Sequence, residues 1–212
     1  MRRDYPIGLV MATEHEAAPF IEREGLHAVE EKPFRIYAGE RFRLIIGGIG
    51  KANAAMAAAR MVWSYGHSAL YNLGAAGATG PGAVVGDIYH IESILELDRP
   101  GVLSKKPRFI KPDTLEGFRR GTLCTQDHPV IEPAERETIR PHAGLVDMEG
   151  AAFAQACRLA GARAYLFKIV TDTPVHETDR DIIVNIELTR HRLYEYACRE
   201  VFDLEPGPTR PR

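Results

Sequence analysis

The stretch GLVDMEGAAFAQAC, residues 144–157, joins a short apolar run to a series of small residues with helical spacing, and two acids stand at the junction. An acid in the first turn of a helix stabilises the helix N-terminus through the macrodipole, and this role would account for either Asp147 or Glu149 alone. Both positions also follow an apolar run directly, which is where ligands bind in an α/β sheet if that run is a strand. The stretch therefore predicts a strand or loop that turns into a core helix beside a candidate ligand site.

Strand-like and helix-like segments alternate on both sides of this stretch. Short apolar runs rich in β-branched residues predict strands, and apolar residues at helical spacing between a cap and a glycine predict helices. The expected strands are residues 7–12, a hairpin within 34–50, 68–78, 84–98, 121–126 and 164–172, and the expected helices are 13–25, 51–66, 151–161 and 178–203. This alternation predicts an α/β protein, a three-layer α/β/α sandwich with a central mixed, twisted sheet.

The expected domain organisation is simple. We expect one domain over residues 1–204 and a disordered tail over residues 205–212. Residues 99–111 carry prolines and lysines and are expected to form a loop. A chain of 212 residues with 45% apolar residues is long enough for one domain with a substantial core.

Charge and hydropathy exclude several classes of partner. The formal charge of −2 provides no basic field for nucleic acid or for an anionic membrane surface, so we expect a small-molecule partner. No apolar run reaches the roughly 20 residues that span a bilayer. The N-terminal sequence lacks the long apolar region of a signal peptide. We therefore expect a soluble cytoplasmic protein.

Metal and disulfide chemistry are not indicated. Cys124, Cys157 and Cys198 lie far apart with no CxxC spacing, which is typical of reduced, buried thiols. His15 and His128 stand in no spacing with carboxylates that would form a ligand set. We expect no metal and no cofactor.

Acidic residues follow three of the expected apolar runs. Glu14 and Glu16 come after the first strand, and Asp172 ends the strand 164–172. Together with the acids of residues 144–157, they are expected to meet at one edge of the sheet, because ligands bind beyond the carboxyl ends of the strands. Burial and mutual repulsion raise the pKa of a carboxyl in such a group, which suits it to general acid catalysis.

Five segments, in this order and spacing, resemble a known family. They are GLVMATEHEA (8–17), GGIGKANAAMAA (47–58), LGAAGATGPGAVVGDI (73–88), VDMEGAAFAQAC (146–157) and KIVTDT (168–173). The chain resembles the nucleoside phosphorylase and nucleosidase superfamily. It looks most like the methylthioadenosine/S-adenosylhomocysteine nucleosidases, with futalosine hydrolase and adenosylhopane nucleosidase as further relatives.

The resemblance implies a role for each acidic site. It implies that Met148 packs against the ribose and that Glu149 accepts hydrogen bonds from the 2′- and 3′-hydroxyls, which an ionised carboxylate does strongly. It assigns Glu16 to activation of the attacking water. It also implies that Asp172 bonds N7 and the 6-amino group of the purine, and a proton delivered to N7 makes the base a neutral leaving group. A 6-oxopurine presents an acceptor where adenine presents a donor, so the aspartate favours adenine.

The resemblance also implies further substrate contacts. These fall on Ala75, Gly77, Pro129, Val130, Asp147 and Lys168. Three of the positions depart from the family pattern, since Ala75 replaces a hydroxyl-bearing residue, Lys168 replaces an arginine, and Pro129 replaces the aromatic ring that stacks on the purine. His128 and Phe153 are the candidates for a substitute ring.

The expected activity is that of a purine nucleosidase, which hydrolyses the N-glycosidic bond of a 5′-substituted adenosine and releases adenine. Phosphorolytic relatives hold phosphate with arginines, and the corresponding stretches 8–16 and 71–78 contain none. Phosphorolysis, a futalosine- or adenosylhopane-type nucleosidase and a non-catalytic nucleoside-binding module stay open as alternatives. The 5′ substituent stays open too, because residues 98–121 differ from the family's usual insert. The resemblance further implies a homodimer, with residues 77–92 near the interface.

Overall fold

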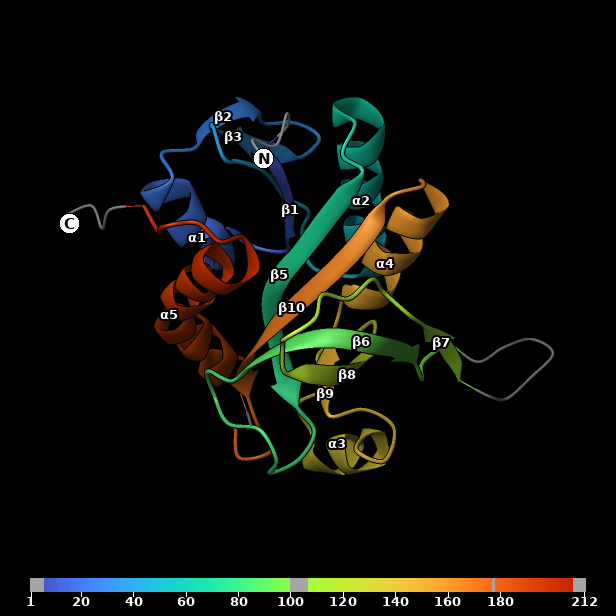
Figure 1. Ribbon diagram of the computed structural model, residues 1–212. Helices are drawn as coiled ribbons and strands as arrows, with labels where there is room; N and C mark the ends of the chain where they lie inside the picture. Colours follow the sequence, from blue (N-terminus) through green and yellow to red (C-terminus); the bar gives the residue numbers. More distant parts are fainter. Residues whose placement is uncertain (1–5, 100–106, 177, 208–212) are drawn as a thin grey trace.

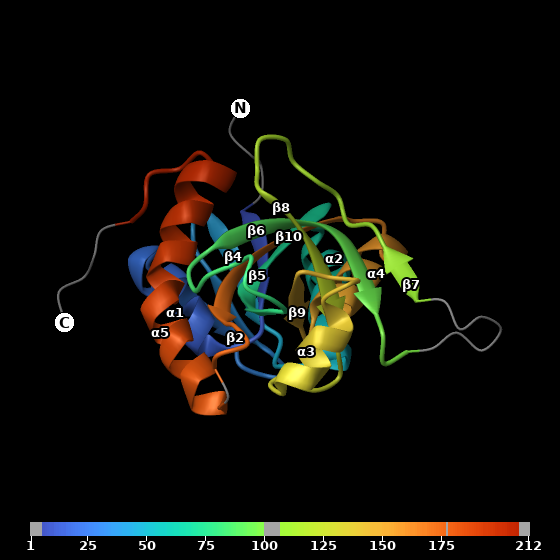
Figure 2. The ribbon, with the colours of Figure 1, turned by 90° about the horizontal axis from the view of Figure 1, so that it is seen from below.

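The computed structural model describes residues 6–99, 107–176 and 178–207. Its strands are β1 (Ile7–Met11), β2 (His27–Glu30), β3 (Arg35–Ala38), β4 (Phe42–Ile46), β5 (Ala69–Ala78), β6 (Ile88–Glu96), β7 (Arg108–Ile110), β8 (Arg120–Thr125), β9 (Leu145–Asp147) and β10 (Arg163–Asp172). Its helices are α1 (Glu14–Arg23), α2 (Lys51–Tyr65), α3 (Pro133–Ile139), α4 (Gly150–Leu159) and α5 (Asp179–Tyr196), which continues into the π-helical turn η1 (Ala197–Val201). Figures 1 and 2 show the sheet between α1 with α5 on one side and α2 with α4 on the other. The predicted three-layer fold with a mixed sheet is confirmed.

β5 is the central strand. The order across the sheet is β10-β6-β8-β9-β5-β1-β4-β3-β2, with β7 beside β6, and a further β10–β5 pairing closes β5, β10, β6, β8 and β9 into a ring. β5 runs parallel to β1 and β10 and antiparallel to β9. Because β1 pairs with β5 only as far as Asn72, the start of α1 lies beside the following residues of β5.

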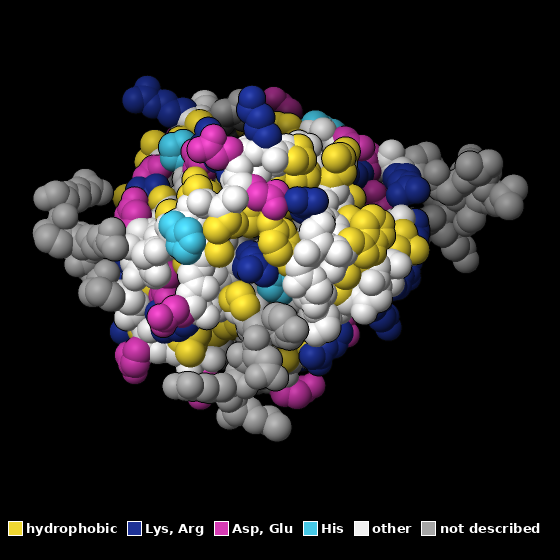
Figure 3. All heavy atoms as spheres, turned by 90° about the horizontal axis from the view of Figure 1, so that it is seen from above, with side chains coloured by type: hydrophobic (Ala, Val, Ile, Leu, Met, Phe, Trp, Pro, Cys, Tyr) yellow, Lys and Arg dark blue, Asp and Glu magenta, His cyan; other side chains and the backbone are white. Residues whose placement is uncertain are grey.

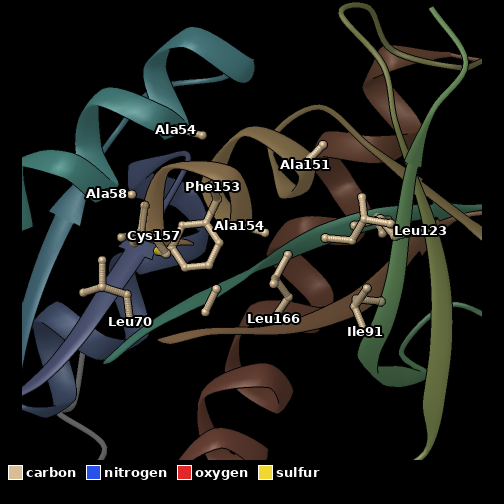
Figure 4. Packing of buried hydrophobic residues seen from close by; sticks show 14 of the residues in the cluster. Ala54, Ala58, Leu70, Ile91, Leu123, Ala151, Phe153, Ala154, Cys157 and Leu166 are labelled. Carbon is tan, nitrogen blue, oxygen red and sulfur yellow. The ribbon is translucent and has the colours of Figure 1, made fainter. Parts of the chain in front are cut away.

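Two clusters of buried residues hold the helices on the sheet. Small residues let α2 and α4 pack closely (Figure 4), and the buried alanines are Ala54, Ala57, Ala58, Ala151 and Ala154. Phe153 of α4 is fully buried in the same cluster as Leu166 of β10. On the other face, Phe20 of α1 meets Tyr194 of α5 edge to face, with ring centroids 5.0 Å apart. This packing fixes where α1 and α4 begin relative to β5.

The structure also contains elements that the sequence did not indicate. The hairpin within residues 34–50 is present as β3 and β4, and β2 adds a third strand to it. The short strands β2 and β7 and the seven-residue helix α3 were missed, because segments this short carry little hydrophobic periodicity. Residues 100–106 of the predicted loop and 208–212 of the predicted tail lie outside the described residues.

The first residues of the predicted tail contact the domain. Arg23 Nε donates to the carbonyl of Gly207 at 2.9 Å, and the Gly207 N–H donates to Tyr194 Oη at 2.6 Å. Arg41 Nη1 donates to the carbonyl of Glu205 at 2.7 Å. Residues 205–207 therefore lie against α1 and α5 without forming a helix or strand.

The surface and the cysteines agree with the composition. On the face seen in Figure 3, positive and negative side chains are interspersed. Within the described residues, no helix is long and apolar enough to cross a bilayer, and no cluster of three or more His, Cys, Asp or Glu side chains is arranged to hold a metal ion. All three cysteines are free and buried, and burial raises the pKa of the Cys124 and Cys157 thiols to about 12.

Candidate active site

Gly74 of β5 leaves room for the carboxylate of Glu16. A Cβ on Gly74 would lie 2.8 Å from Glu16 Oε1 and 3.9 Å from Lys168 Nζ, so a side chain there would displace the carboxylate. Glu16 is 6% exposed, and its Oε1 accepts the N–H of Ala75 at 2.8 Å. Its Oε2 accepts the N–H and the hydroxyl of Thr13 at 3.0 and 2.7 Å. Glu16 is thus both the capping-box acid of α1 and the side chain that faces the middle of β5.

The neighbouring acid Glu14 points away from this region. Its exposed carboxylate pairs with Arg35 and accepts the hydroxyl of Tyr37 at 3.3 Å. The difference follows from the cap, because Thr13 as N-cap makes Glu16 the third helical residue, whose side chain reaches back over the helix N-terminus. The structure therefore favours Glu16 over Glu14 as a site residue.

Asp147 holds the junction between β9 and α4 together. Its Oδ2 accepts the N–H of Gly150 at 2.8 Å and pairs with Lys168 Nζ at 2.8 Å. Its Oδ1 accepts the hydroxyl of Thr125 at 2.7 Å. Glu149, the N-cap residue of α4, makes no capping hydrogen bond with its side chain. Asp147 therefore caps the helix and leaves the Glu149 carboxyl available for another partner.

Glu149 is a buried carboxyl whose charge is only partly compensated. It is 8% exposed, and its Oε1 accepts the N–H of Gly50, in the loop before α2, at 2.9 Å. Burial and the nearby Asp147 carboxylate raise the pKa of Glu149 to about 7, against the opposing effect of Lys168. Burial alone would lower the pKa of Lys168, but Asp147 and Glu149 outweigh it, and the pKa is raised. A buried carboxyl that changes charge near neutral pH at the end of a strand is a candidate ligand-binding group.

A β-bulge places Asp172 beside Gly77. β10 pairs with β5 in register as far as Val170 and Ala76, and the register then shifts so that Asp172 stands opposite Gly77. An unbroken ladder would place Asp172 opposite Ala78. A Cβ on Gly77 would lie 2.5 Å from Asp172 Oδ2, so the carboxylate packs directly against the backbone of Gly77. The bulge and the glycine together bring this 4%-exposed carboxylate to the carboxyl end of β5.

Arg136 of α3 binds Asp172, a contact that the sequence did not indicate. The side chain is fully buried, and its Nη2 forms an ion pair with Asp172 Oδ2. Nη1 donates to the carbonyl of Ala78 at 2.6 Å, and Nε donates to that of Ile131 at 3.4 Å. Asp172 Oδ1 accepts the hydroxyl of Thr171 at 2.9 Å. Both oxygens of the carboxyl that was expected to donate a proton thus accept hydrogen bonds in this structure.

The other predicted positions divide between this region and the core. Met148 is half-buried next to Glu149, and Pro129 is exposed. Val130 is 5% exposed and packs in a cluster with Ile139 of α3, so its side chain serves the core.

Neither candidate for a substitute ring stands free beside the acids. Phe153 is fully buried in the cluster shared by α2 and α4. The half-exposed His128 ring lies with Nε2 2.8 Å from Glu135 Oε1. The core position of Phe153 rules it out as a ring that stacks on a ligand at Asp172.

α5 closes one side of the Glu16 region. A small pocket there is lined by Glu16, Ala75, Ile169, Thr171, Ile186, Thr189, Arg190 and Leu193. Arg190 in this lining lies outside residues 8–16 and 71–78, the two stretches in which phosphorolytic relatives would carry arginines for phosphate. Arg190 Nη2 pairs with Glu187 at 2.6 Å, and Nη1 donates to the carbonyl of His15 at 3.2 Å. The guanidinium is therefore already bound to an acid, and the pocket also holds the Glu16 carboxylate.

The fold and this group of buried carboxylates are those that the sequence resemblance to nucleoside phosphorylases and nucleosidases implies, and a comparison with family models agrees. Residues 6–199 match the model of the phosphorylase superfamily, and the chain belongs to that superfamily. It is 26% identical over 202 residues to the 5′-methylthioadenosine/S-adenosylhomocysteine nucleosidase of Chromohalobacter salexigens, covering 79% of this chain and 86% of the relative. It is 25% identical over 203 residues to the aminodeoxyfutalosine nucleosidase of Campylobacter jejuni, covering 82% and 89%.

Solved structures share the fold. A Helicobacter pylori 5′-methylthioadenosine/S-adenosylhomocysteine nucleosidase matches with a TM-score of 0.81 at 18% identity, covering 94% of this chain and 98% of that chain. Futalosine hydrolase of the same species matches with a TM-score of 0.82 at 18% identity, with the same coverage. At these identities the likeness concerns the fold.

Glu149→Gln is expected to stabilise the protein at pH 8 far more than at pH 5. The pKa of Glu149 is raised from its ordinary value of 4.5 to about 7 in the folded protein. Stability is therefore highest below pH 4.5, where the carboxyl is neutral in the folded and the unfolded state, and this stability is lost as the pH rises through 7. The neutral amide removes that loss, which is about 3 kcal/mol for a shift of this size. Urea unfolding at the two pH values measures the difference.

The matched control is Glu116→Gln, because the Glu116 side chain is 99% exposed. This variant is expected to leave stability unchanged at both pH values. A Glu149→Gln protein less stable than the wild type at pH 8 would contradict the raised pKa.

Proposed function

We propose that this protein hydrolyses the N-glycosidic bond of a 5′-substituted adenosine and releases adenine. The observation that carries the proposal is the arrangement of buried carboxyls along β5, with Glu16 at Gly74 and Asp172 at Gly77. The hydrolase class rests on membership of the superfamily and on the nucleosidases among the relatives. The cytoplasmic location stays a prediction from the sequence.

Each carboxyl has a separate task in this proposal. The ionised Glu149 accepts the ribose hydroxyls, with Met148 against the sugar. Glu16 accepts a proton from a water molecule, whose oxygen bonds to C1′ as the bond from C1′ to the purine N9 breaks. The electron pair of that bond passes to the purine, and Asp172 delivers a proton to N7, so that adenine leaves as a neutral base.

Base release is expected to proceed in phosphate-free buffer and to yield the free sugar. The pocket beside Glu16 already holds that carboxylate, and the guanidinium of Arg190 is paired with Glu187, so both features disfavour a phosphate ion there. A panel of 5′-substituted adenosines, assayed for free adenine with and without phosphate, measures this. Strict dependence on phosphate with a ribose 1-phosphate product would establish phosphorolysis instead. Tight binding of intact nucleoside without adenine release would identify a non-catalytic binding module.

Asp172→Asn is expected to lower the rate of adenine release by about 10²–10⁴-fold, because the amide has no proton to transfer to N7. The amide NH₂ would also face the 6-amino group of adenine as donor to donor, so 6-oxopurine nucleosides should lose less activity. Steady-state rates on matched adenosine and inosine substrates measure both effects. Asp203→Asn, at an exposed position, is the control and should be fully active. Near wild-type activity of Asp172→Asn on the adenosine would remove Asp172 as the acid.

We also propose a homodimer. Residues 77–92, which the family resemblance places near the subunit interface, include Val84, whose side chain is 63% exposed. Burial of this apolar side chain against a second copy would remove its apolar area from water, which is favourable. Sedimentation at micromolar concentration is expected to show a dimer, and a monomer alone would overturn this assignment.

A further inference from the structure

We propose that Arg136 is a positioning residue of the reaction that acts through Asp172. The inference rests on the proposed nucleosidase function. By occupying one carboxylate oxygen of Asp172, the guanidinium selects the other oxygen, Oδ1, as the one that carries the proton to the purine.

The chemistry of the two partners of Asp172 carries this step. A guanidinium has only donors and keeps its protons, so Arg136 Nη2 favours the unprotonated form of Oδ2, which is the stronger acceptor of its hydrogen bond. The Thr171 hydroxyl bonds Oδ1 at 2.9 Å, and a hydroxyl both donates and accepts. It can therefore bond Oδ1 in the protonated and in the ionised state. Oδ1 is therefore the oxygen on which a proton costs least, and it is the one that releases the proton to N7.

The charge of Arg136 matters most once the proton has left. Transfer from Oδ1 to N7 converts a neutral carboxyl into a carboxylate, which then forms a full ion pair with the guanidinium. The pair is buried, with side-chain exposures of 1% for Arg136 and 5% for Asp172, and charge-assisted hydrogen bonds are strong in such surroundings. Arg136 therefore stabilises the product of the proton transfer, and its loss should lower kcat more than it raises KM.

Arg136 also fixes the position of the carboxyl. Its Nη1 bond to the Ala78 carbonyl ties it to the end of β5, and its Nε bond to the Ile131 carbonyl ties it to the segment before α3. The planar fork of donors makes these contacts together with the ion pair, and the single ammonium of a lysine cannot reproduce that geometry. Arg136→Lys should therefore keep the charge and recover only part of the activity.

A double-mutant cycle tests the inference, with the full chain, 5′-methylthioadenosine as the probe substrate and adenine release as the signal. Arg136→Met is expected to lower kcat at least about tenfold, with KM within about threefold, and Arg136→Lys should fall between this variant and the wild type. In the Asp172→Asn background, Arg136→Met should add less than about threefold, because the group through which Arg136 acts has lost its proton. Arg140→Met, at the end of the same helix with a side chain 51% exposed, is the matched control and should be fully active.

The outcomes separate the inference from the proposed function. Losses of equal size in the wild-type and Asp172→Asn backgrounds would mean that Arg136 only supports the fold, which overturns the inference while the nucleosidase assignment stands. No adenine release by the wild type from any 5′-substituted adenosine of the panel would instead defeat the proposed function, and a substrate other than 5′-methylthioadenosine that does release adenine takes its place in the cycle. If Arg136→Met fails to fold because it leaves a buried carboxylate unpaired, Arg136→Lys supplies the same cycle, since it keeps the positive charge. Equal losses from Arg136→Lys in the two backgrounds would overturn the inference in the same way.

Discussion

The missing side chains at Gly74 and Gly77 are the constraint on which the site depends. β5 is bonded to strands on both sides, and the space above and below such a strand is normally filled by its own side chains. At these two positions the space is taken instead by a carboxylate from another element with a cation close to it. The carboxylates can lie so close to the backbone only because the glycines have no Cβ. The central strand of the fold is therefore also the floor of the site.

The two buried cations, Arg136 and Lys168, do not compensate the neighbouring acids equally. Asp172 has the Arg136 guanidinium to itself, whereas the Lys168 ammonium is bonded to Asp147 and only influences Glu149 from a distance. Of these two acids only Asp147 is bonded to the ammonium directly, so Lys168 compensates the charge of Glu149 less than that of Asp147. The burial of Glu149 is consequently only partly compensated, and its raised pKa follows from that position. Such a group costs stability in the empty protein and gains most from a ligand that donates hydrogen bonds.

Patterns within single segments of the sequence predicted much of this arrangement. They could not predict contacts between segments that lie far apart in the chain. Thr13 and Glu16 form a capping box that is visible in the sequence, and the cap alone decides that Glu16, not Glu14, reaches β5. By contrast, the ion pair of Arg136 with Asp172 spans 36 positions and starts from a helix of seven residues. The bulge that turns Asp172 toward Gly77 exists only in the pairing of β10 with β5. Neither the partner of an arginine nor a register shift has a signature within its own segment.

Structural and functional roles are combined differently in the two acids that open helices. Glu16 uses one oxygen for the cap of α1 and the other for the backbone of β5, so a loss of activity on its replacement mixes chemistry with helix stability. At the start of α4 the tasks are split between two residues, because Asp147 takes the Gly150 N–H and the lysine, and Glu149 makes no cap at all. This split explains why two acids flank the strand-to-helix junction. The first stabilises the turn, and the second is thereby free to change its charge and its partner without loosening the helix.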